Sequence, residues 1–258
     1  MGPVVHSVTD RFLLTGKVAL VTGGSRGLGR EMVLAFAQAG ADVVITSRNA
    51  DACAELAQQV IQETGRNALA VGCHVGHWDE LPGLLDAAYD RFGRLDVLVN
   101  NAGKSPLYPS LTAVDERLWD SVLAVNLKGP FRLTALAGAR MAAGDGGSII
   151  NISSTAAAHP RPDVIPYAAA KAGLNAITAG FALAYGPSVR VNAIMAGPFL
   201  TDISKAWDME AFGQRARHHG LQRGGRPDEI VGAALYLASD ASSFTTGAVL
   251  AVDGGVPK

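Results

Sequence analysis

Short apolar runs recur along the chain and alternate with stretches of helical spacing. The first run, residues 17–22, is almost wholly apolar and stops at glycines, which is typical of a strand buried on both faces. Similar runs occupy residues 42–47, 68–73, 95–100, 148–153, 188–194 and 248–252. The pattern therefore predicts about seven short strands.

Apolar positions three or four residues apart predict helices between these strands. In residues 29–39 the side chains of Met32, Val33 and Phe36 share one helical face, and Gly40 stands where a C-terminal cap is expected. Further helices are predicted over residues 50–63, 79–92, 114–142, 167–184 and 227–238. Strict alternation of strand and helix indicates an α/β fold, a doubly wound parallel sheet with helices on both faces.

Two segments depart from this alternation. Residues 1–14 precede the first strand and predict an N-terminal tail, whereas residues 15–258 contain no repeat or linker and predict a single domain. Residues 199–226 mix polar and large apolar side chains, so we expect a mobile flap there. Its large apolar side chains either line a substrate pocket or pack the flap onto the sheet; they are Phe199, Leu200, Trp207, Met209 and Phe212.

Composition narrows the classes of function. Hydrophobic residues make up 48% of the 258 residues and the net charge is −1, so a full core is expected but no nucleic-acid or anionic-membrane partner. The two cysteines, Cys53 and Cys73, form no metal or disulfide pattern, which fits a reducing compartment. Because no signal peptide or membrane-length apolar run is found, we expect a cytoplasmic protein without a membrane partner.

A glycine-rich turn joins the first predicted strand to the first helix. Its sequence from Thr22 is T-G-G-S-R-G-L-G. Glycines permit close backbone approach, and the free amides at a helix start attract phosphate, so a dinucleotide is the expected ligand. The residues assigned to cofactor binding here are Gly23, Ser25, Arg26, Gly27, Leu28 and Gly29.

The end of the second predicted strand bears on which dinucleotide binds. An acidic residue about 20 positions after the glycines would bind the ribose 2′-hydroxyl of NAD. Here that place is taken by Ser47 and Arg48. With Arg26, Arg48 provides a second guanidinium for a 2′-phosphate, which favours NADP(H). The alternative is that both arginines are solvated surface residues, which leaves NAD(H) open.

Tyr167 and Lys171 are candidates for proton transfer. Their spacing of four places both side chains on one helix face. A free tyrosine has a pKa of about 10, and a nearby lysine charge favours its phenolate. Ser153 and Ser154 end the preceding strand, at the edge where open α/β sheets bind ligands, so either hydroxyl is placed to hold a substrate oxygen.

The complete set of motifs resembles the short-chain dehydrogenase/reductase family, including its 3-oxoacyl-carrier-protein reductases. The motifs follow family order over nearly the whole chain: the glycine turn, Asn100-Asn101-Ala102-Gly103, Asn126, a serine thirteen residues before a Tyr-x-x-x-Lys, and Asp253-Gly254-Gly255. The resemblance implies a single Rossmann-type domain. It also selects Ser154 over Ser153 as the catalytic serine.

The resemblance implies a role for each catalytic residue. Tyr167 is the general acid in reduction, and Ser154 polarises the carbonyl. Lys171 lowers the pKa of Tyr167 and holds the nicotinamide ribose. Asn126 keeps a water molecule in the proton relay.

The same resemblance assigns further cofactor contacts. Asn101, Ala102 and Gly103 lie beside the adenosine ribose, and Gly197, Phe199 and Thr201 lie beside the nicotinamide. Two departures stand out: His74-Val75 replaces the usual Asp-Val beside adenine, and Ala196-Gly197 replaces the usual Pro-Gly. We assign His74 and Val75 to the cofactor site. No metal site is expected, because His218 and His219 are adjacent and lack ligand spacing.

The sequence thus predicts an NADP(H)-dependent reductase that interconverts a ketone and a secondary alcohol. Two alternatives stay open: an NAD-dependent catabolic dehydrogenase for a sugar, steroid or hydroxyacyl alcohol, and a cofactor-binding regulatory protein without turnover. The helix after Tyr167 is rich in alanine and glycine, which permits close helix packing. Family members pair through this helix, so the resemblance implies a homodimer or homotetramer.

Overall fold

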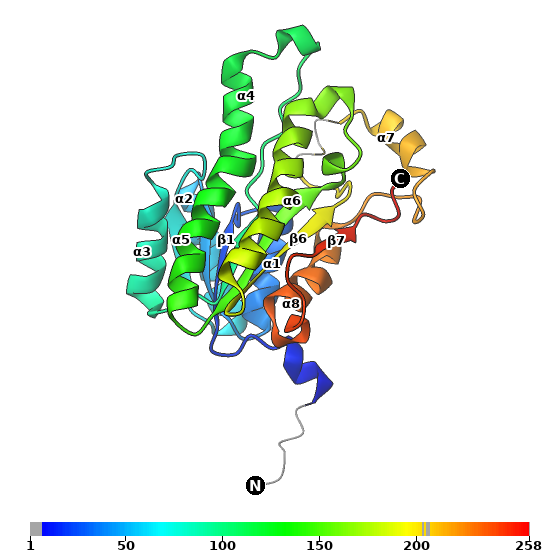
Figure 1. Cartoon of the computed structure of the whole chain (residues 1–258). Coiled ribbons are helices and arrows are strands. Elements are labelled where there is room, and N and C mark those ends of the chain that lie inside the picture. The colour runs from blue at the N-terminus through cyan, green and yellow to red at the C-terminus, as the bar shows by residue number, and fades with distance from the viewer. Residues whose placement is uncertain (1–6, 203, 205–206, 258) are drawn as a thin grey trace.

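Seven parallel strands form one sheet in the order β3-β2-β1-β4-β5-β6-β7, as far as the computed structural model describes the chain, which is over residues 7–202, 204 and 207–257 (Figure 1). The strands are β1 (Val18–Thr22), β2 (Asp42–Ser47), β3 (Ala68–Gly72), β4 (Val97–Asn100), β5 (Gly147–Ser154), β6 (Val189–Ala196) and β7 (Val249–Val252). The predicted α/β class and doubly wound parallel sheet are confirmed.

Helices cover both faces of the sheet, because each crossover between parallel strands carries a helix. One face packs against α1 (Gly27–Gln38), α2 (Ala50–Thr64) and α8 (Val231–Ala238), with Phe36, Leu56 and Leu237 in its core. The other packs against α3 (Leu81–Phe92), α5 (Gly129–Ala143) and α6 (Ile165–Tyr185), with Leu85 and Leu133 in its core. Figure 1 shows α5 and α6 side by side across the second face.

The order of the strands places a crevice between β1 and β4. From β1 the chain adds β2 and β3 on one side, then returns to add β4 to β7 on the other. At such a reversal the connecting loops diverge to opposite faces, and ligands bind beside the carboxyl ends of the two strands. The glycine turn after β1 and the Asn101 segment after β4 therefore meet at this crevice.

The helical stretch predicted over residues 114–142 is present over residues 116–143, with one turn that is π-helical. The structure divides it into α4 (Glu116–Leu123), a π-helical turn (Ala124–Lys128) and α5. Pro130 favours this wider turn, because proline has no amide hydrogen for the Asn126 carbonyl four residues earlier. This proline was the overlooked signal.

The flap predicted over residues 199–226 contains a helix that the sequence pattern did not indicate, α7 (Met209–Ala216). Asp208 caps it by accepting from the amides of Glu210 and Ala211, both at 3.0 Å. Inside the flap the Trp207 ring packs on Phe212, with 5.4 Å between centroids. Part of the flap, residues 203, 205 and 206, lies outside the described residues.

The chain packs onto the domain earlier than predicted. Residues 1–6 of the predicted tail lie outside the described residues, and a short 3-10 helix (Val8–Phe12) follows. Leu14, which the sequence places at the end of the tail, is buried, and its amide donates to the Ala39 carbonyl oxygen at 2.8 Å. Among the described helices, none is long and apolar enough to cross a membrane.

Candidate active site

The glycine-rich turn opens directly into α1. A Cβ on Gly29 would lie 2.2 Å from the Gly23 carbonyl oxygen, so only glycine fits there. α1 begins at Gly27, and no side chain within the described part of the protein caps its first amides. Free amides and the helix dipole at such a start attract anions. The turn therefore fits the phosphates of a dinucleotide.

Thr22 and Asn101 join the carboxyl ends of β1 and β4. Thr22 Oγ1 accepts from the backbone amides of Asn101 at 2.9 Å and Ala102 at 3.0 Å. In return, Asn101 Nδ2 donates to the carbonyl oxygens of Thr22 at 2.8 Å and Gly23 at 3.1 Å. The sequence analysis gave Thr22 no role, although it directly precedes the glycines. The structure shows that it holds the Asn101 segment against the glycine turn.

Arg26 and Arg48 border the crevice from two adjoining segments. Ser25 Oγ in the glycine turn donates to Ser47 Oγ at the end of β2 at 3.1 Å, and each arginine follows one of these serines. Both arginines are exposed. The Arg26 guanidinium faces Asp202 of the flap, with 3.8 Å between Nη1 and Oδ2.

His74 lines a cavity of about 600 Å³ between the loop after β3 and α4. Its ring stacks on His77 with 4.2 Å between centroids, and its Nδ1 accepts from the Gly76 amide at 3.1 Å. Burial lowers the pKa of His74, and the charges of His77 and Arg48 act in the same direction. The ring is therefore neutral at neutral pH. Val75, the other residue assigned to this region, is buried.

Ser154, Tyr167 and Lys171 come together where β5 meets α6. Ser154 ends β5, and its side chain is close enough to the Tyr167 hydroxyl to act on the pKa of Tyr167. Lys171 lies one helical turn after Tyr167, with Nζ 5.6 Å from the centroid of the tyrosine ring. Its Nζ donates to the Ile152 carbonyl oxygen at 2.7 Å. Three of the four side chains that the sequence analysis assigned to catalysis thus form one cluster.

Burial dominates the ionisation of this cluster. It raises the pKa of Tyr167, while the neighbouring Ser154 side chain acts in the opposite direction. It lowers the pKa of Lys171 to about 7, so the amine is only partly charged at neutral pH. The sequence analysis gave Lys171 the task of lowering the pKa of Tyr167, but in the chain by itself the desolvation of both groups outweighs that effect.

Asn126 sits in the π-helical turn and binds the backbone of Lys104 from both ends of its amide. Its Nδ2 donates to the Lys104 carbonyl oxygen at 2.7 Å, and its Oδ1 accepts from the Lys104 amide at 3.2 Å. Asn126 is fully buried, and Gly103 lies next to it, since a Cβ on Gly103 would stand 3.3 Å from Asn126 Oδ1. Asn126 therefore fixes the path of the segment after β4.

A buried chain of polar side chains lies beneath the cluster. Asn100 Nδ2 donates to Thr134 Oγ1 at 3.0 Å and to Asn151 Oδ1 at 2.8 Å. Asn151 Nδ2 then donates to Thr178 Oγ1 at 2.8 Å. These bonds tie β4, β5, α5 and α6 together. Sequence reasoning missed this chain, because its members are far apart in sequence and only polar residues at strand or helix interiors mark it.

The segment assigned to the nicotinamide side follows β6. A Cβ on Gly197 would lie 2.5 Å from the Cα of Asp253, so glycine is required for this close approach. Phe199 is buried, and Thr201 lies against the start of α1, 3.5 Å from where a Gly27 Cβ would be. Gly27 and Thr201 also line a second cavity of about 410 Å³.

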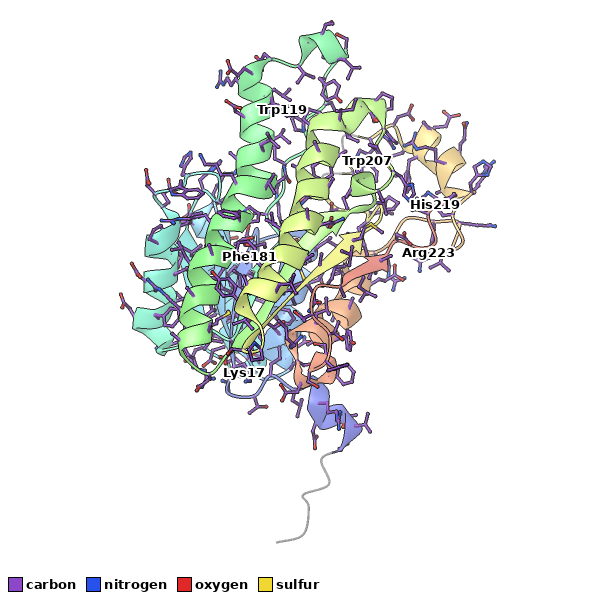
Figure 2. The ribbon with its side chains drawn as sticks, in the orientation of Figure 1. Lys17, Trp119, Phe181, Trp207, His219 and Arg223 are labelled. Carbon is purple, nitrogen blue, oxygen red and sulfur yellow. The ribbon has the colours of Figure 1, made fainter. Side chains whose placement is uncertain are left out.

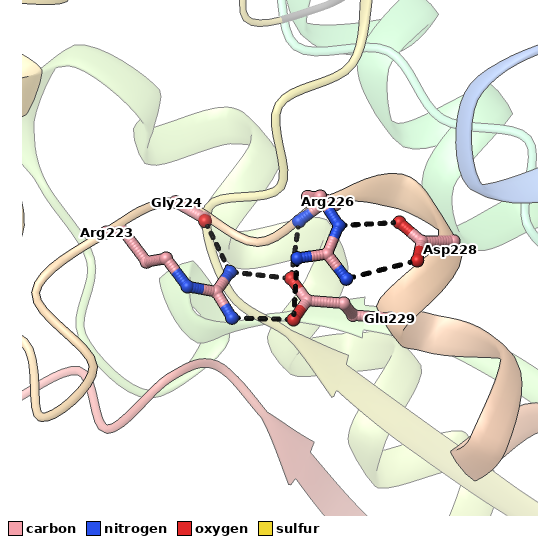
Figure 3. A network of polar contacts seen from close by, with 5 residues as sticks. All are labelled: Arg223, Gly224, Arg226, Asp228 and Glu229. Atoms are coloured by element: carbon pink, nitrogen blue, oxygen red, sulfur yellow. Dashed lines mark hydrogen bonds and ion pairs between the residues drawn. The ribbon is translucent and has the colours of Figure 1, made fainter.

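The return segment of the flap is held on both sides. The Gly225 amide donates to the Pro198 carbonyl oxygen at 3.1 Å, and the Leu221 amide donates to the Gly254 carbonyl oxygen at 2.8 Å. Arg223 forks onto both carboxylate oxygens of Glu229 at 2.6 Å (Figure 3).

The flap lies at the edge of the sheet that carries the site. Figure 2 places Trp207, His219 and Arg223 together at this edge, and Lys17, which precedes β1, at the opposite one.

Among the described residues, no group of three or more histidine, cysteine or acidic side chains is suited to a metal ion.

Comparison with known proteins gives consistent matches over almost the full chain. The family model described as enoyl-(acyl carrier protein) reductase matches residues 23–257. A short chain dehydrogenase/reductase of Aspergillus oryzae is 38% identical over 254 residues, covering 96% of this chain and 97% of the relative.

Solved structures show the same similarity. NADPH-dependent 3-quinuclidinone reductase from Rhodotorula rubra matches with a TM-score of 0.92 at 30% identity, covering 99% of this chain and 97% of that chain. A 7α-hydroxysteroid dehydrogenase, solved with NADH and 7-oxo glycochenodeoxycholic acid, also has a TM-score of 0.92 at 34% identity, covering 97% and 98%.

Proposed function

The chain belongs to the short-chain dehydrogenase/reductase family and is an oxidoreductase acting on CH–OH groups; within that family, we propose that it uses NADP(H) to interconvert a ketone and a secondary alcohol. Tyr167 is the general acid in reduction and the general base in oxidation. The observation that carries the proposal is the meeting of Ser154, at the end of β5, with Tyr167 and buried Lys171 in the first two turns of α6.

Each residue of the cluster has a separate task. The Ser154 hydroxyl is placed to donate to a substrate carbonyl oxygen, and Tyr167 gives that oxygen its proton. The Nζ of Lys171 is a hydrogen-bond donor next to the tyrosine ring. We assign it to bind the hydroxyls of the ribose that carries the nicotinamide. The dinucleotide supplies the hydride. Asn126 is assigned to hold a water molecule of the proton relay. Pro130 supports this assignment, because it has no amide hydrogen to donate to the Asn126 carbonyl oxygen, which leaves that oxygen able to accept from water.

The preference for NADP(H) rests on Arg26 and Arg48. The bond between Ser25 and Ser47 draws the two segments that carry these arginines together, and no carboxylate follows β2 at this point. Two guanidinium groups suit a phosphate dianion, whereas NAD offers only a ribose hydroxyl. The similar structures include one named for NADPH and one solved with NADH, so the preference depends on this chain's own residues.

A panel assay tests the reaction. Purified protein is mixed with NADPH or NADH and with 3-oxoacyl thioesters, cyclic ketones, sugar ketones or oxosteroids, and cofactor oxidation is followed. We expect turnover on at least one class. Tyr167→Phe should lower kcat by about 10²-fold or more while NADPH binding is retained. Cofactor binding without turnover on any class would favour the regulatory alternative.

Replacement of Arg48 tests the cofactor. Arg48→Asp should raise the Kd for NADPH by about tenfold or more, because one charged partner of the phosphate becomes repulsive, and should leave the Kd for NADH nearly unchanged. Arg91→Asp, an exposed arginine on α3, is the matched control. If Arg48→Asp and the parent bound NADPH with equal affinity, Arg48 would not bind the 2′-phosphate, and the NAD-dependent alternative would be favoured.

Assembly and location complete the proposal. α6 presents an exposed row of small and apolar side chains, Ala172, Ala176, Ala179 and Leu183, which suits a second copy of the chain. We propose a homodimer or homotetramer on this basis. Cys53 and Cys73 are both free thiols, which supports a reducing, cytoplasmic location.

A further inference from the structure

Tyr108 links the segment after β4 to the start of α6. Its hydroxyl donates to the Pro162 carbonyl oxygen at 2.6 Å and accepts from the Ile165 amide at 2.9 Å. Pro162 and Ile165 lie more than fifty positions later in the sequence. One phenol hydroxyl thus connects two segments that both border the catalytic cluster.

The amide that Tyr108 accepts from is the first of α6. The first amides of a helix have no partner within the helix and need an outside acceptor. The residue before α6 is Val164, whose side chain has no acceptor and makes no capping bond. Tyr108 therefore caps the N-terminus of α6 from a distant part of the chain. The capped amide, that of Ile165, lies two residues before Tyr167.

The same short turn, Pro162–Val164, also carries an ion pair of its own. Asp163 forms an ion pair with Arg161. Its pKa is lowered first by the hydrogen bonds from Arg161, and the charge of Arg215 on α7 acts in the same direction. Tyr108 supplies the turn's contact with the β4 segment.

That segment is itself anchored. Asn126 holds its beginning through the Lys104 backbone, and Tyr108 holds it again four residues later. In Figure 1 this stretch of chain rises from the sheet beside the first turns of α6. A displacement of this segment would therefore displace the start of α6, and a displacement of the α6 start would displace the segment.

We propose that Tyr108 is a positioning residue for Tyr167. This inference rests on the proposed function. In it, Tyr108 holds the first turn of α6 at the position from which Tyr167 reaches the substrate oxygen. Proton transfer depends steeply on such placement, and an error of about 1 Å can cost as much as 10²-fold. Tyr108 itself touches neither Ser154 nor Tyr167 through any described hydrogen bond.

The test compares Tyr108→Phe with Tyr185→Phe. Tyr185 is the matched control, because its hydroxyl also donates to a backbone carbonyl, that of Ala135 at 2.7 Å, but at the other end of α6. In Tyr108→Phe we expect kcat to fall about tenfold, the Kd for NADPH to stay within about twofold, and the ionisation in the kcat pH profile to move by about half a unit or more. In Tyr185→Phe all three should stay near the parent values.

Hydrogen exchange supplies a readout that does not depend on turnover. Amides in residues 161–171 should exchange about tenfold faster in Tyr108→Phe and at the parent rate in Tyr185→Phe. Unchanged exchange, or faster exchange with parental kcat and pH profile, overturns the inference, as does an equal loss in both variants. If the parent protein turns over no substrate on the panel, the proposed function fails and the inference with it.

Discussion

At the residue scale, burial gives the catalytic cluster its unusual ionisation. Tyr167 and Lys171 both lie in a poorly solvated site, and each is pushed toward its neutral form. A neutral tyrosine keeps the proton that reduction requires. A lysine with a pKa of about 7 costs folding free energy at neutral pH, because the unfolded chain holds its proton more tightly.

This cost leads to a pH-dependent stability prediction. Between the folded pKa of about 7 and the unfolded value of 10.5, the unfolded chain binds more protons at Lys171, so its contribution to stability rises with pH. Without cofactor, Lys171→Met should therefore melt about 2–4 °C above the parent at pH 7, and this gain should shrink toward pH 10. Calorimetry over this range is the measurement. An equal gain at both ends would contradict the assigned burial effect.

At the scale of elements, the flap is fixed at its base. Glu229, in the 3-10 turn that leads into α8, accepts from the Arg223 guanidinium and from the Arg226 amide at 2.7 Å. The hydrogen bonds from Arg223, and to a smaller extent the one from the Arg226 amide, lower the pKa of Glu229 to about 2. The carboxylate thus joins the return segment of the flap to the main domain.

Removal of this carboxylate charge should loosen the flap base. In Glu229→Gln, amides of residues 217–226 should exchange about threefold faster, because the charged hydrogen bonds from Arg223 are lost. The effect is small because single ion pairs at exposed sites contribute little. Asp228→Asn, which loses only the pair with Arg226, is the control. In the parent, the stabilising effect of Glu229 should persist above the ordinary pKa of 4.5 and fade as pH falls toward about 2. Equal exchange in both variants and the parent would refute the anchoring role.

At the scale of the whole molecule, the crevice and the proposed assembly surface lie on different parts of α6. Tyr167 is in its first turn, whereas Leu183 near its end is 87% exposed. An exposed row of small side chains on a long helix permits close packing of an identical helix.

Light scattering tests the assembly. The parent should have the mass of two or four chains, and Ala176→Arg should shift it toward a smaller species, because a guanidinium cannot fit where two helices are in contact. Ala54→Arg, at an exposed position on α2 across the sheet, should leave the mass unchanged. A parent that runs as a monomer would rule out the proposed pairing.

Local patterns in the sequence determined most of the fold. Strand runs and helical spacing depend on neighbouring residues, so the strands and five of the helices could be located before any contact was known. The glycine turn and the Tyr167–Lys171 spacing are local for the same reason. The π-helical turn inside the helical stretch over residues 114–142 was not foreseen, because Pro130 was overlooked.

Tertiary structure alone decided how these pieces act together. The bonds of Thr22 with Asn101, of Asn126 with Lys104, and of Tyr108 with Ile165 join residues that are 22 to 79 positions apart. No periodicity marks such pairs, because they form only when the sheet order brings the strand ends together. The low pKa of Lys171 likewise follows from burial by distant segments, which the sequence around it does not specify.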